Sequence, residues 1–173
     1  MSIVIVDQQT ARDNFLKQPF RLKHTLADNA LFTLPRLIEL AKSQPRDAIE
    51  YNSGKVAVGA KIEDIPKIDM PVDEVIKSIE KANAWMVLKN VERQPAYRAM
   101  LESFVREANE AAGRNPTDYS DLQGFIFISS AKATTPFHND NEENILIQIK
   151  GDKFVRTFDN ADRKLIRDRK STR

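Results

Sequence analysis

The sequence contains no cysteine and only two histidines, His24 and His138. Disulfide scaffolds and thiolate metal centres are therefore excluded, and the absence of cysteine agrees with the cytoplasmic location that we expect. No apolar run approaches the roughly 18 residues of a membrane span. The start of the chain, Met1 to Asp7, lacks the basic region that opens a signal peptide. We therefore expect no membrane partner and a site built from few imidazoles.

An excess of charge of one sign is also missing. The 27 Lys and Arg residues nearly balance the 25 Asp and Glu residues, which leaves a net charge of +2. So small a charge argues against nucleic acid as the partner. Hydrophobic residues make up 41% and charged residues 30% of the 173 residues, and the chain has no internal repeat. These values are typical of one globular domain with a core of its own.

Apolar residues at helical spacing predict three helices, over residues 34–43, from Asp69 to Ala82, and from Pro95 to Ala112 with Gly113 placed to end it. Strand-like runs are expected at 3–6, 51–58, 84–89 and 124–129, and again at 144–150 and 153–158. Helices and strands thus alternate first, and strands cluster afterwards. This order predicts an α+β fold with helices packed against a β-core.

His138 and Asp140 form the only pair in the sequence that resembles a set of metal ligands. They are two residues apart, so on an extended backbone both side chains leave the same face. A histidine and a carboxylate, joined by a second histidine, make the facial triad that holds non-haem Fe(II). The alternative reading of the tripeptide alone is a histidine that forms a salt bridge with a neighbouring acid.

The residues after this pair predict a β-hairpin. Residues 144–150 and 153–158 would be its strands, and Gly151-Asp152 its two-residue turn. In that pairing Asn144 and Lys153 share one face of the hairpin, while the isoleucines and phenylalanines share the other. We expect the face with Asn144 and Lys153 to line a pocket.

These residues carry a family resemblance. The pattern is Thr135-x-x-His138-x-Asp140-x-x-x-Asn144, followed by Gln148-Ile149-Lys150-Gly151-x-Lys153. It resembles the first half of a JmjC-type Fe(II)- and 2-oxoglutarate-dependent oxygenase core. It is most similar to the cupin-like branch that contains the asparaginyl hydroxylase inhibiting hypoxia-inducible factor.

The resemblance implies a role for each matched residue. His138 and Asp140 would bind iron, and Thr135 and Lys153 would hold the distal carboxylate of 2-oxoglutarate, the cosubstrate. Asn144 would help to hold its other end. The implied fold is a partial double-stranded β-helix, a cupin-like jelly roll. Residues 1–120 would be an N-terminal α/β region packed on it, 121–159 the first core strands, and 160–173 a charged tail.

The resemblance also requires a second metal histidine downstream of Lys153, and residues 159–173 contain none. His24 would have to supply the third ligand, and the simplest interpretation is a truncated family member. Whether the chain is an enzyme, a hydroxylase or demethylase acting on a protein or a small molecule, is therefore left open. The alternative is a non-catalytic regulatory or interaction protein, for example in transcription. A half-barrel would also expose a strand edge through which a homodimer could form.

Overall fold

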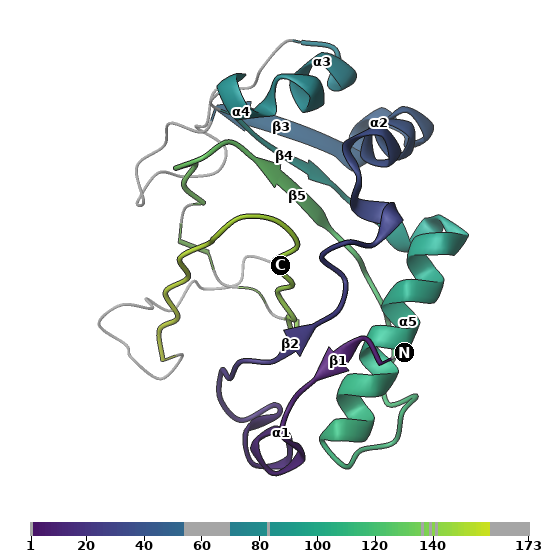
Figure 1. Ribbon diagram of the computed structural model, residues 1–173, viewed down its shortest axis with the longest axis vertical. Coiled ribbons are helices and arrows are strands. Elements are labelled where there is room, and N and C mark those ends of the chain that lie inside the picture. Colours follow the sequence, from purple (N-terminus) through teal and green to yellow (C-terminus); the bar gives the residue numbers. More distant parts are fainter. Residues whose placement is uncertain are drawn as a thin grey trace, which may run out of the picture.

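The computed structural model describes residues 2–53, 70–82, 84–135, 137–138, 140 and 142–159. Its larger sheet has three antiparallel strands in the order β3 (Ile49–Ser53), β4 (Ala84–Leu88) and β5 (Ile126–Ser129). A smaller sheet pairs β1 (Val4–Ile5) with β2 (Lys23–His24). Figure 1 shows β1 and β2 beyond the β5 edge of the larger sheet.

The three strands of the larger sheet place most of their buried apolar residues on one face. The register pairs Ile49 with Leu88 and Met86 with Ile128, and all four side chains are buried. Successive strand residues point to opposite faces, so Phe127 lies on the other side of the sheet, where it is 49% exposed. The sheet therefore needs a cover mainly on the face that carries Met86.

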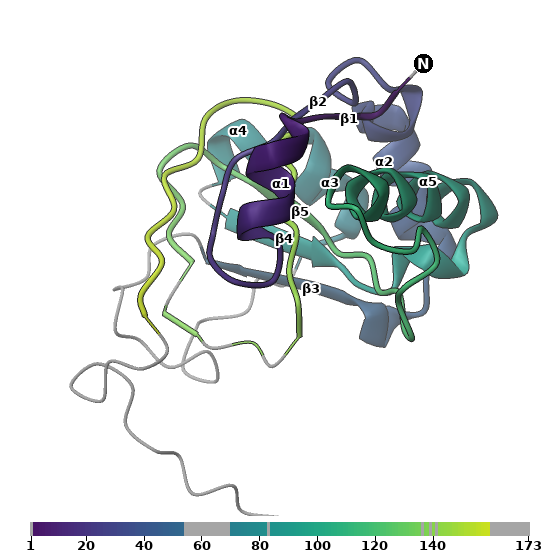
Figure 2. The same cartoon turned by 90° about the horizontal axis from the view of Figure 1, so that it is seen from below.

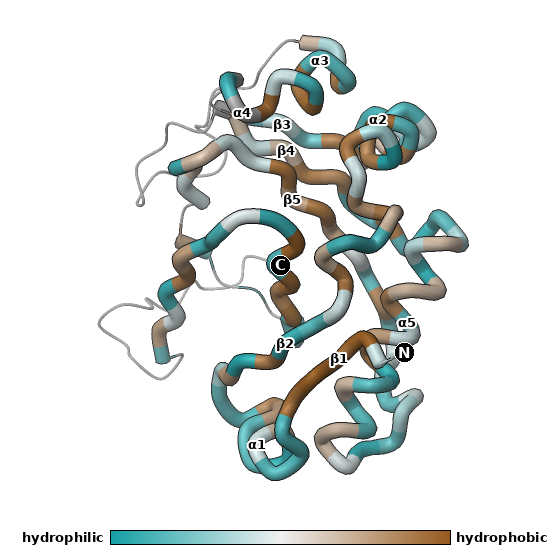
Figure 3. Tube along the Cα trace, in the orientation of Figure 1, coloured by the Kyte–Doolittle hydropathy of each residue, from teal (hydrophilic) through white to brown (hydrophobic). Residues whose placement is uncertain are grey.

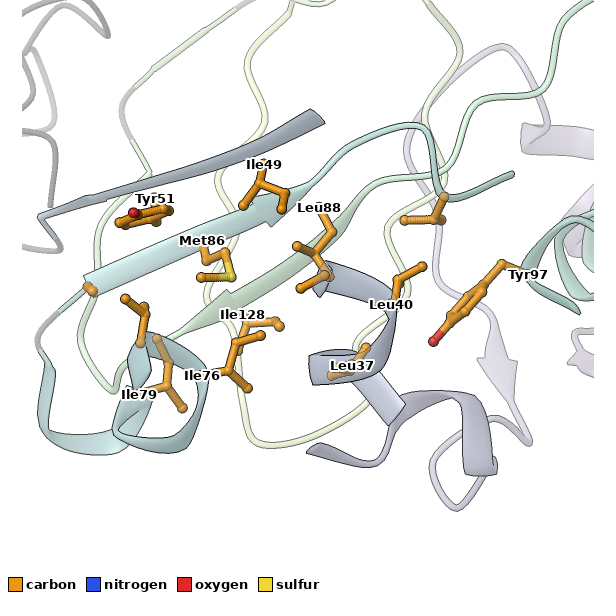
Figure 4. Close-up of a cluster of buried hydrophobic side chains, with 14 residues drawn as sticks. Leu37, Leu40, Ile49, Tyr51, Ile76, Ile79, Met86, Leu88, Tyr97 and Ile128 are labelled. Carbon is orange, nitrogen blue, oxygen red and sulfur yellow. The ribbon is translucent and has the colours of Figure 1, made fainter. Parts of the chain in front are cut away.

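Three helices provide that cover: α2 (Leu34–Ser43), α3 (Val72–Lys77) and α4 (Ile79–Ala82). Figure 4 shows side chains of these helices directed toward Met86, Leu88 and Ile128 of the sheet. The predicted helix over 34–43 is confirmed, with Pro35 in its first turn. Proline is favourable there because its missing N–H would have no partner within the helix.

The second predicted helix is not continuous. Helix α3 ends at Lys77, and α4 begins at Ile79, after Ser78 leaves helical geometry at φ −102° and ψ 9°. The Ser78 hydroxyl donates to the carbonyl of Glu74 at 2.6 Å. A serine that bonds back to the preceding turn competes with the helix hydrogen bonds. The predicted cap, Asp69, lies outside the described residues.

A second, smaller core lies between α1 (Gln8–Asn14), the β1–β2 pair and α5 (Pro95–Ala111). Its buried members are Val4, Leu26, Phe104 and Ala108. Helix α5 serves both cores, because Tyr97 in its first turn belongs to the first one. The predicted helix from Pro95 is confirmed, and Gly113 follows its end with φ +71°. Within the described residues, short 3-10 helices lie at η1 (Ala30–Phe32), η2 (Arg46–Ala48) and η4 (Val91–Arg93).

Most of the predicted strands are also confirmed. Strands β4 and β5 lie within the predicted runs 84–89 and 124–129, and β1 lies within 3–6. Strand β3 begins two residues before the predicted run 51–58, of which residues 54–58 lie outside the described residues. The α+β class is therefore confirmed. The described strands form two small sheets and do not show jelly-roll packing.

Residues 142–159 form an irregular arm. The prediction of two paired strands in this part of the chain is wrong. No strand is assigned within this arm, although Gly151 has φ +72° and the chain bends at the predicted turn. We call residues 142–150 the first limb and 151–159 the second limb. Figure 2 shows the two limbs diverging from the bend.

The first limb has an apolar partner of its own, which explains why the hairpin does not close. Ile147 and Ile149 are partly buried against the smaller core. Figure 3 shows that β1, which belongs to this core, is hydrophobic along its length. Strand propensity depends on such neighbours more than on the residues themselves.

No helix among the described residues is long and apolar enough to cross a membrane.

Candidate functional site

His138 and Asp140 lie in the irregular chain that follows β5. Neither residue lies in a strand or at the end of one, which differs from the strand-like backbone expected for the pair. The structure nevertheless brings the two side chains together, with 3.6 Å between His138 Nε2 and Asp140 Oδ2. Their side chains are 46% and 44% exposed, which leaves both accessible to an ion from solvent.

The 3.6 Å separation is that of an ion pair, which is the alternative reading of the tripeptide, and it is also compatible with a cation between the two side chains. It exceeds the usual N–H···O distance, whereas two metal–ligand bonds of about 2.1 Å each can span it. An imidazole nitrogen and a carboxylate oxygen are also donors that Fe(II) accepts. The pair therefore fits two positions of a metal site.

Asn144 orients the carboxylate of this pair. Its Nδ2 donates to Asp140 Oδ2 at 2.6 Å, the same oxygen that faces His138. An amide that donates to a metal-binding carboxylate fixes its direction, as second-shell groups commonly do. The resemblance gave Asn144 a role toward 2-oxoglutarate, and the structure instead places it against Asp140.

Lys153 and Thr135 occupy different surroundings. Lys153 Nζ lies 5.5 Å from the centroid of the Phe127 ring, on the outer side of β5. Thr135 is exposed just before the metal-ligand pair. Lys153 and Asn144 thus have different neighbours, and the shared hairpin face predicted for them does not form.

An aromatic pair brings the second limb to the His138 segment. The rings of Phe137 and Phe158 meet edge to face, with centroids 5.7 Å apart and planes at 74°. Such edge-to-face pairs are favourable because the ring edge is positive and the face negative. Sequence reasoning missed this contact, although Phe137 stands inside the motif and Phe158 ends a strand-like run.

No third donor joins the pair within the described part of the chain. Among these residues no group of three His, Cys, Asp or Glu is arranged to hold a metal ion. His24, the candidate third ligand, uses both ring nitrogens elsewhere: Nε2 lies 2.9 Å from the carbonyl oxygen of Gln148, and Nδ1 lies 3.1 Å from the N–H of Leu26. In this arrangement His24 is a hydrogen-bonded structural residue and not a metal ligand.

Two shallow surface depressions lie along α5, apart from the motif. Both are lined by α5, one of them together with residues from Ser2 to Gln8, and neither includes Thr135, His138, Asp140, Asn144 or Lys153. The pocket expected beside Asn144 and Lys153 is thus not one of these two.

A model of the cupin-like domain family matches residues 17–172. The match covers β2, the whole three-stranded sheet, α2 to α5, and all five residues of the motif, and it begins after β1 and α1. No curated protein and no solved structure matched the chain.

Proposed function

The chain belongs to the cupin-like domain family, and we propose that it is an Fe(II)- and 2-oxoglutarate-dependent oxygenase in type. In this proposal His138 and Asp140 hold the metal. The remaining ligand would be supplied within a jelly-roll fold of the kind that the family resemblance implies. The observation that carries it is the 3.6 Å separation of His138 Nε2 and Asp140 Oδ2 on an accessible surface. Within the described residues the pair is not joined by a third His, Cys, Asp or Glu, so the donor that completes the site is left open in this proposal.

Each residue of the motif has a defined task in this proposal. His138 binds through a neutral ring nitrogen, and Asp140 supplies a charged oxygen that Asn144 orients by its amide hydrogen bond. Lys153 and Thr135 pair with a carboxylate of the cosubstrate, Lys153 as a compact positive charge. Iron with 2-oxoglutarate would supply the oxidising chemistry of the reaction.

The proposal predicts weak binding of metal with little turnover. Two protein donors leave a metal under-coordinated, and orientation by Asn144 does not replace a third donor. We expect anaerobic titration with Mn(II), followed by paramagnetic relaxation, to show one saturable site. The variant His138→Ala should lose at least about tenfold in affinity, because removal of a direct ligand costs at least as much as loss of a supporting contact.

The role of the Asp140 carboxylate is tested by the same Asp→Asn change at two positions, one in the proposed site and one outside it as the control. Asp140→Asn should weaken Mn(II) binding, whereas Asp152→Asn, at the exposed bend of the arm, should leave it unchanged. Equal affinity in wild type, Asp140→Asn and His138→Ala would contradict the proposal. Tight binding with clear succinate production would show that another donor completes the site.

A second candidate function is non-catalytic binding of a partner, and one observation favours it. The second limb exposes large apolar side chains, among which Phe154 is 82% exposed and Val155 53%. Exposed apolar groups that gather on one segment commonly mark an interaction site. Mn(II) affinity that is equal in wild type, His138→Ala and Asp140→Asn, together with no 2-oxoglutarate decarboxylation, would favour this candidate over the oxygenase.

A further inference from the structure

His24 connects the beginning of the chain to the arm. It is the last residue of β2, where it pairs with Val4 of β1. Its Nε2 lies 2.9 Å from the carbonyl oxygen of Gln148, a residue 124 positions later. Its Nδ1 lies 3.1 Å from the backbone N–H of Leu26. One ring therefore contacts both the turn after β2 and the first limb of the arm.

These two partners determine which tautomer the ring adopts. A backbone N–H only donates, so Nδ1 must offer its lone pair to Leu26. A backbone carbonyl only accepts, so Nε2 must carry the hydrogen that it donates to Gln148. The ring is thus neutral and protonated on Nε2: a proton added at Nδ1 would break the bond from Leu26, and the other tautomer would break both bonds.

The first limb is seated around this hydrogen bond. Ile147 and Ile149, on either side of Gln148, are partly buried against the core of Val4, Leu26, Phe104 and Ala108. The Gln148 side chain stays exposed and donates to the carbonyl of Lys150 at 2.9 Å. No strand pairing joins the limb to β2, so the isoleucines supply apolar contact and His24 supplies a directional one.

We infer that His24 is a positioning residue: its neutral, Nε2-protonated ring anchors the first limb and so fixes where Asn144 stands relative to Asp140. Asn144 lies four residues before Gln148 on the same limb and donates to Asp140 at 2.6 Å. The importance of that placement for metal binding rests on the proposed function. The anchoring itself does not.

Two substitutions separate the two hydrogen bonds of His24. In His24→Asn the side-chain oxygen reaches the place of Nδ1 and can accept from Leu26, but no donor reaches Gln148. In His24→Gln the amide nitrogen reaches the place of Nε2 and can donate to Gln148. The asparagine variant therefore keeps the local turn and loses the link to the arm, and the glutamine variant keeps the link.

Limited trypsin digestion measures how often the arm detaches. Cleavage after Lys150 should be about fivefold faster in His24→Asn than in wild type, which corresponds to one hydrogen bond of about 1 kcal/mol. His24→Gln should remain close to wild type. Cleavage after Arg106 in α5, which reports unfolding of the whole chain, should be equal in all three. Equal rates after Lys150 in all three proteins, or equal acceleration in both variants, would overturn the inference.

The tautomer gives a second test that a merely structural side chain would not pass. The chain has two histidines, so His138→Ala leaves His24 alone in a histidine-ring ¹⁵N–¹H spectrum. We expect a protonated Nε2 and an unprotonated Nδ1, and the opposite tautomer or an averaged signal would contradict the anchoring. The two proposals can fail separately. If wild type binds no Mn(II) but His24→Asn is still cleaved faster after Lys150, the proposed function is contradicted and the anchoring is supported.

Discussion

At the scale of single residues, Glu107 shows how one side chain can secure the start of the chain. Its Oε2 accepts from the Ser2 hydroxyl at 2.6 Å and from the backbone N–H groups of Ile3 and Val4 at 2.7 and 2.9 Å. Burial alone would raise the pKa of Glu107, but the hydrogen bonds from Ser2, Val4 and Ile3 outweigh it and lower the pKa. The charged form of Glu107 therefore stabilises the fold.

The lowered pKa predicts a pH-dependent effect of Glu107→Gln. Since folding lowers this pKa, the stabilisation is complete above the ordinary pKa of glutamate, about 4.3, and is lost as pH falls through the lowered value. We expect the variant to lose about 1 kcal/mol near neutral pH, because solvent partly screens this side chain. Urea denaturation at neutral and acidic pH measures the difference, which should shrink in acid.

Glu110→Gln is the matched control, because Glu110 lies one turn further along α5 and is exposed. It should change stability little at either pH. A loss in Glu107→Gln that stays the same in acid would show that the carboxylate charge is not what holds residues 2–4.

At the scale of elements, Ser130 joins three of them just after β5 ends. Its buried hydroxyl accepts from the N–H of Ala84, the first residue of β4, at 3.0 Å, and donates to the carbonyl of Ile79, the first residue of α4. Its own N–H donates to the carbonyl of Ala84 at 2.9 Å. One small side chain thus fixes the position of α4 relative to strands β4 and β5.

Ser130→Ala should therefore destabilise the fold by about 2 kcal/mol, because two buried backbone groups would lose a partner. Ser129→Ala is the control: Ser129 is the exposed neighbour in β5, and its loss should have little effect. Equilibrium unfolding followed by fluorescence of Trp85, the single tryptophan, measures both. Equal stability of the two variants would contradict this assignment.

The elements also show how far sequence reasoning reaches. Helices α2 and α5 were predicted almost to the residue, because their apolar periodicity and terminal Pro and Gly act locally. The break at Ser78 was missed, since a serine in a helix gives no sign of whether its hydroxyl bonds back to the preceding turn. The arm failed for a different reason: its β-branched pattern requires a pairing partner, which the pattern does not specify.

The same distinction applies to the candidate site. The close approach of His138 and Asp140 follows from two residues of spacing, and the structure contains it at 3.6 Å. The neighbours of Lys153 and Asn144 depend on where each limb packs, which rests on Phe127 and on Ile147 and Ile149. Short-range geometry was therefore predictable, and the wider arrangement was not. The roles of these four residues toward a metal and a cosubstrate stay predictions.

At the scale of the whole molecule, two cores are connected through shared elements. Helix α5 contributes Tyr97 to the larger core and Phe104 to the smaller one. Phe32 packs against both cores, and its ring meets that of Tyr97 edge to face with centroids 6.4 Å apart. The cooperativity of unfolding should depend on this junction.

Phe32→Ala tests the coupling of the two cores. We expect a loss of about 2 kcal/mol, below the roughly 3 to 5 kcal/mol of a fully buried phenylalanine, because the side chain is only partly buried. We also expect the Trp85 fluorescence transition, which reports the larger core, to separate from the helix signal in circular dichroism. In wild type the two should coincide, as in a two-state transition. Coincident transitions in Phe32→Ala would mean that α5 alone couples the cores.

The two cores also differ in when the ribosome can complete them. Every residue of the larger core, from Leu31 to Ile128, precedes the arm in the chain, and the buried residues of the smaller core are all made by Ala108. Chains fold during synthesis from the N-terminal side. Ile147, Ile149 and the carbonyl of Gln148 thus emerge when the surface that receives them, including His24, already exists. We therefore expect Asn144 to reach Asp140 through a late docking of the first limb, after both cores have formed.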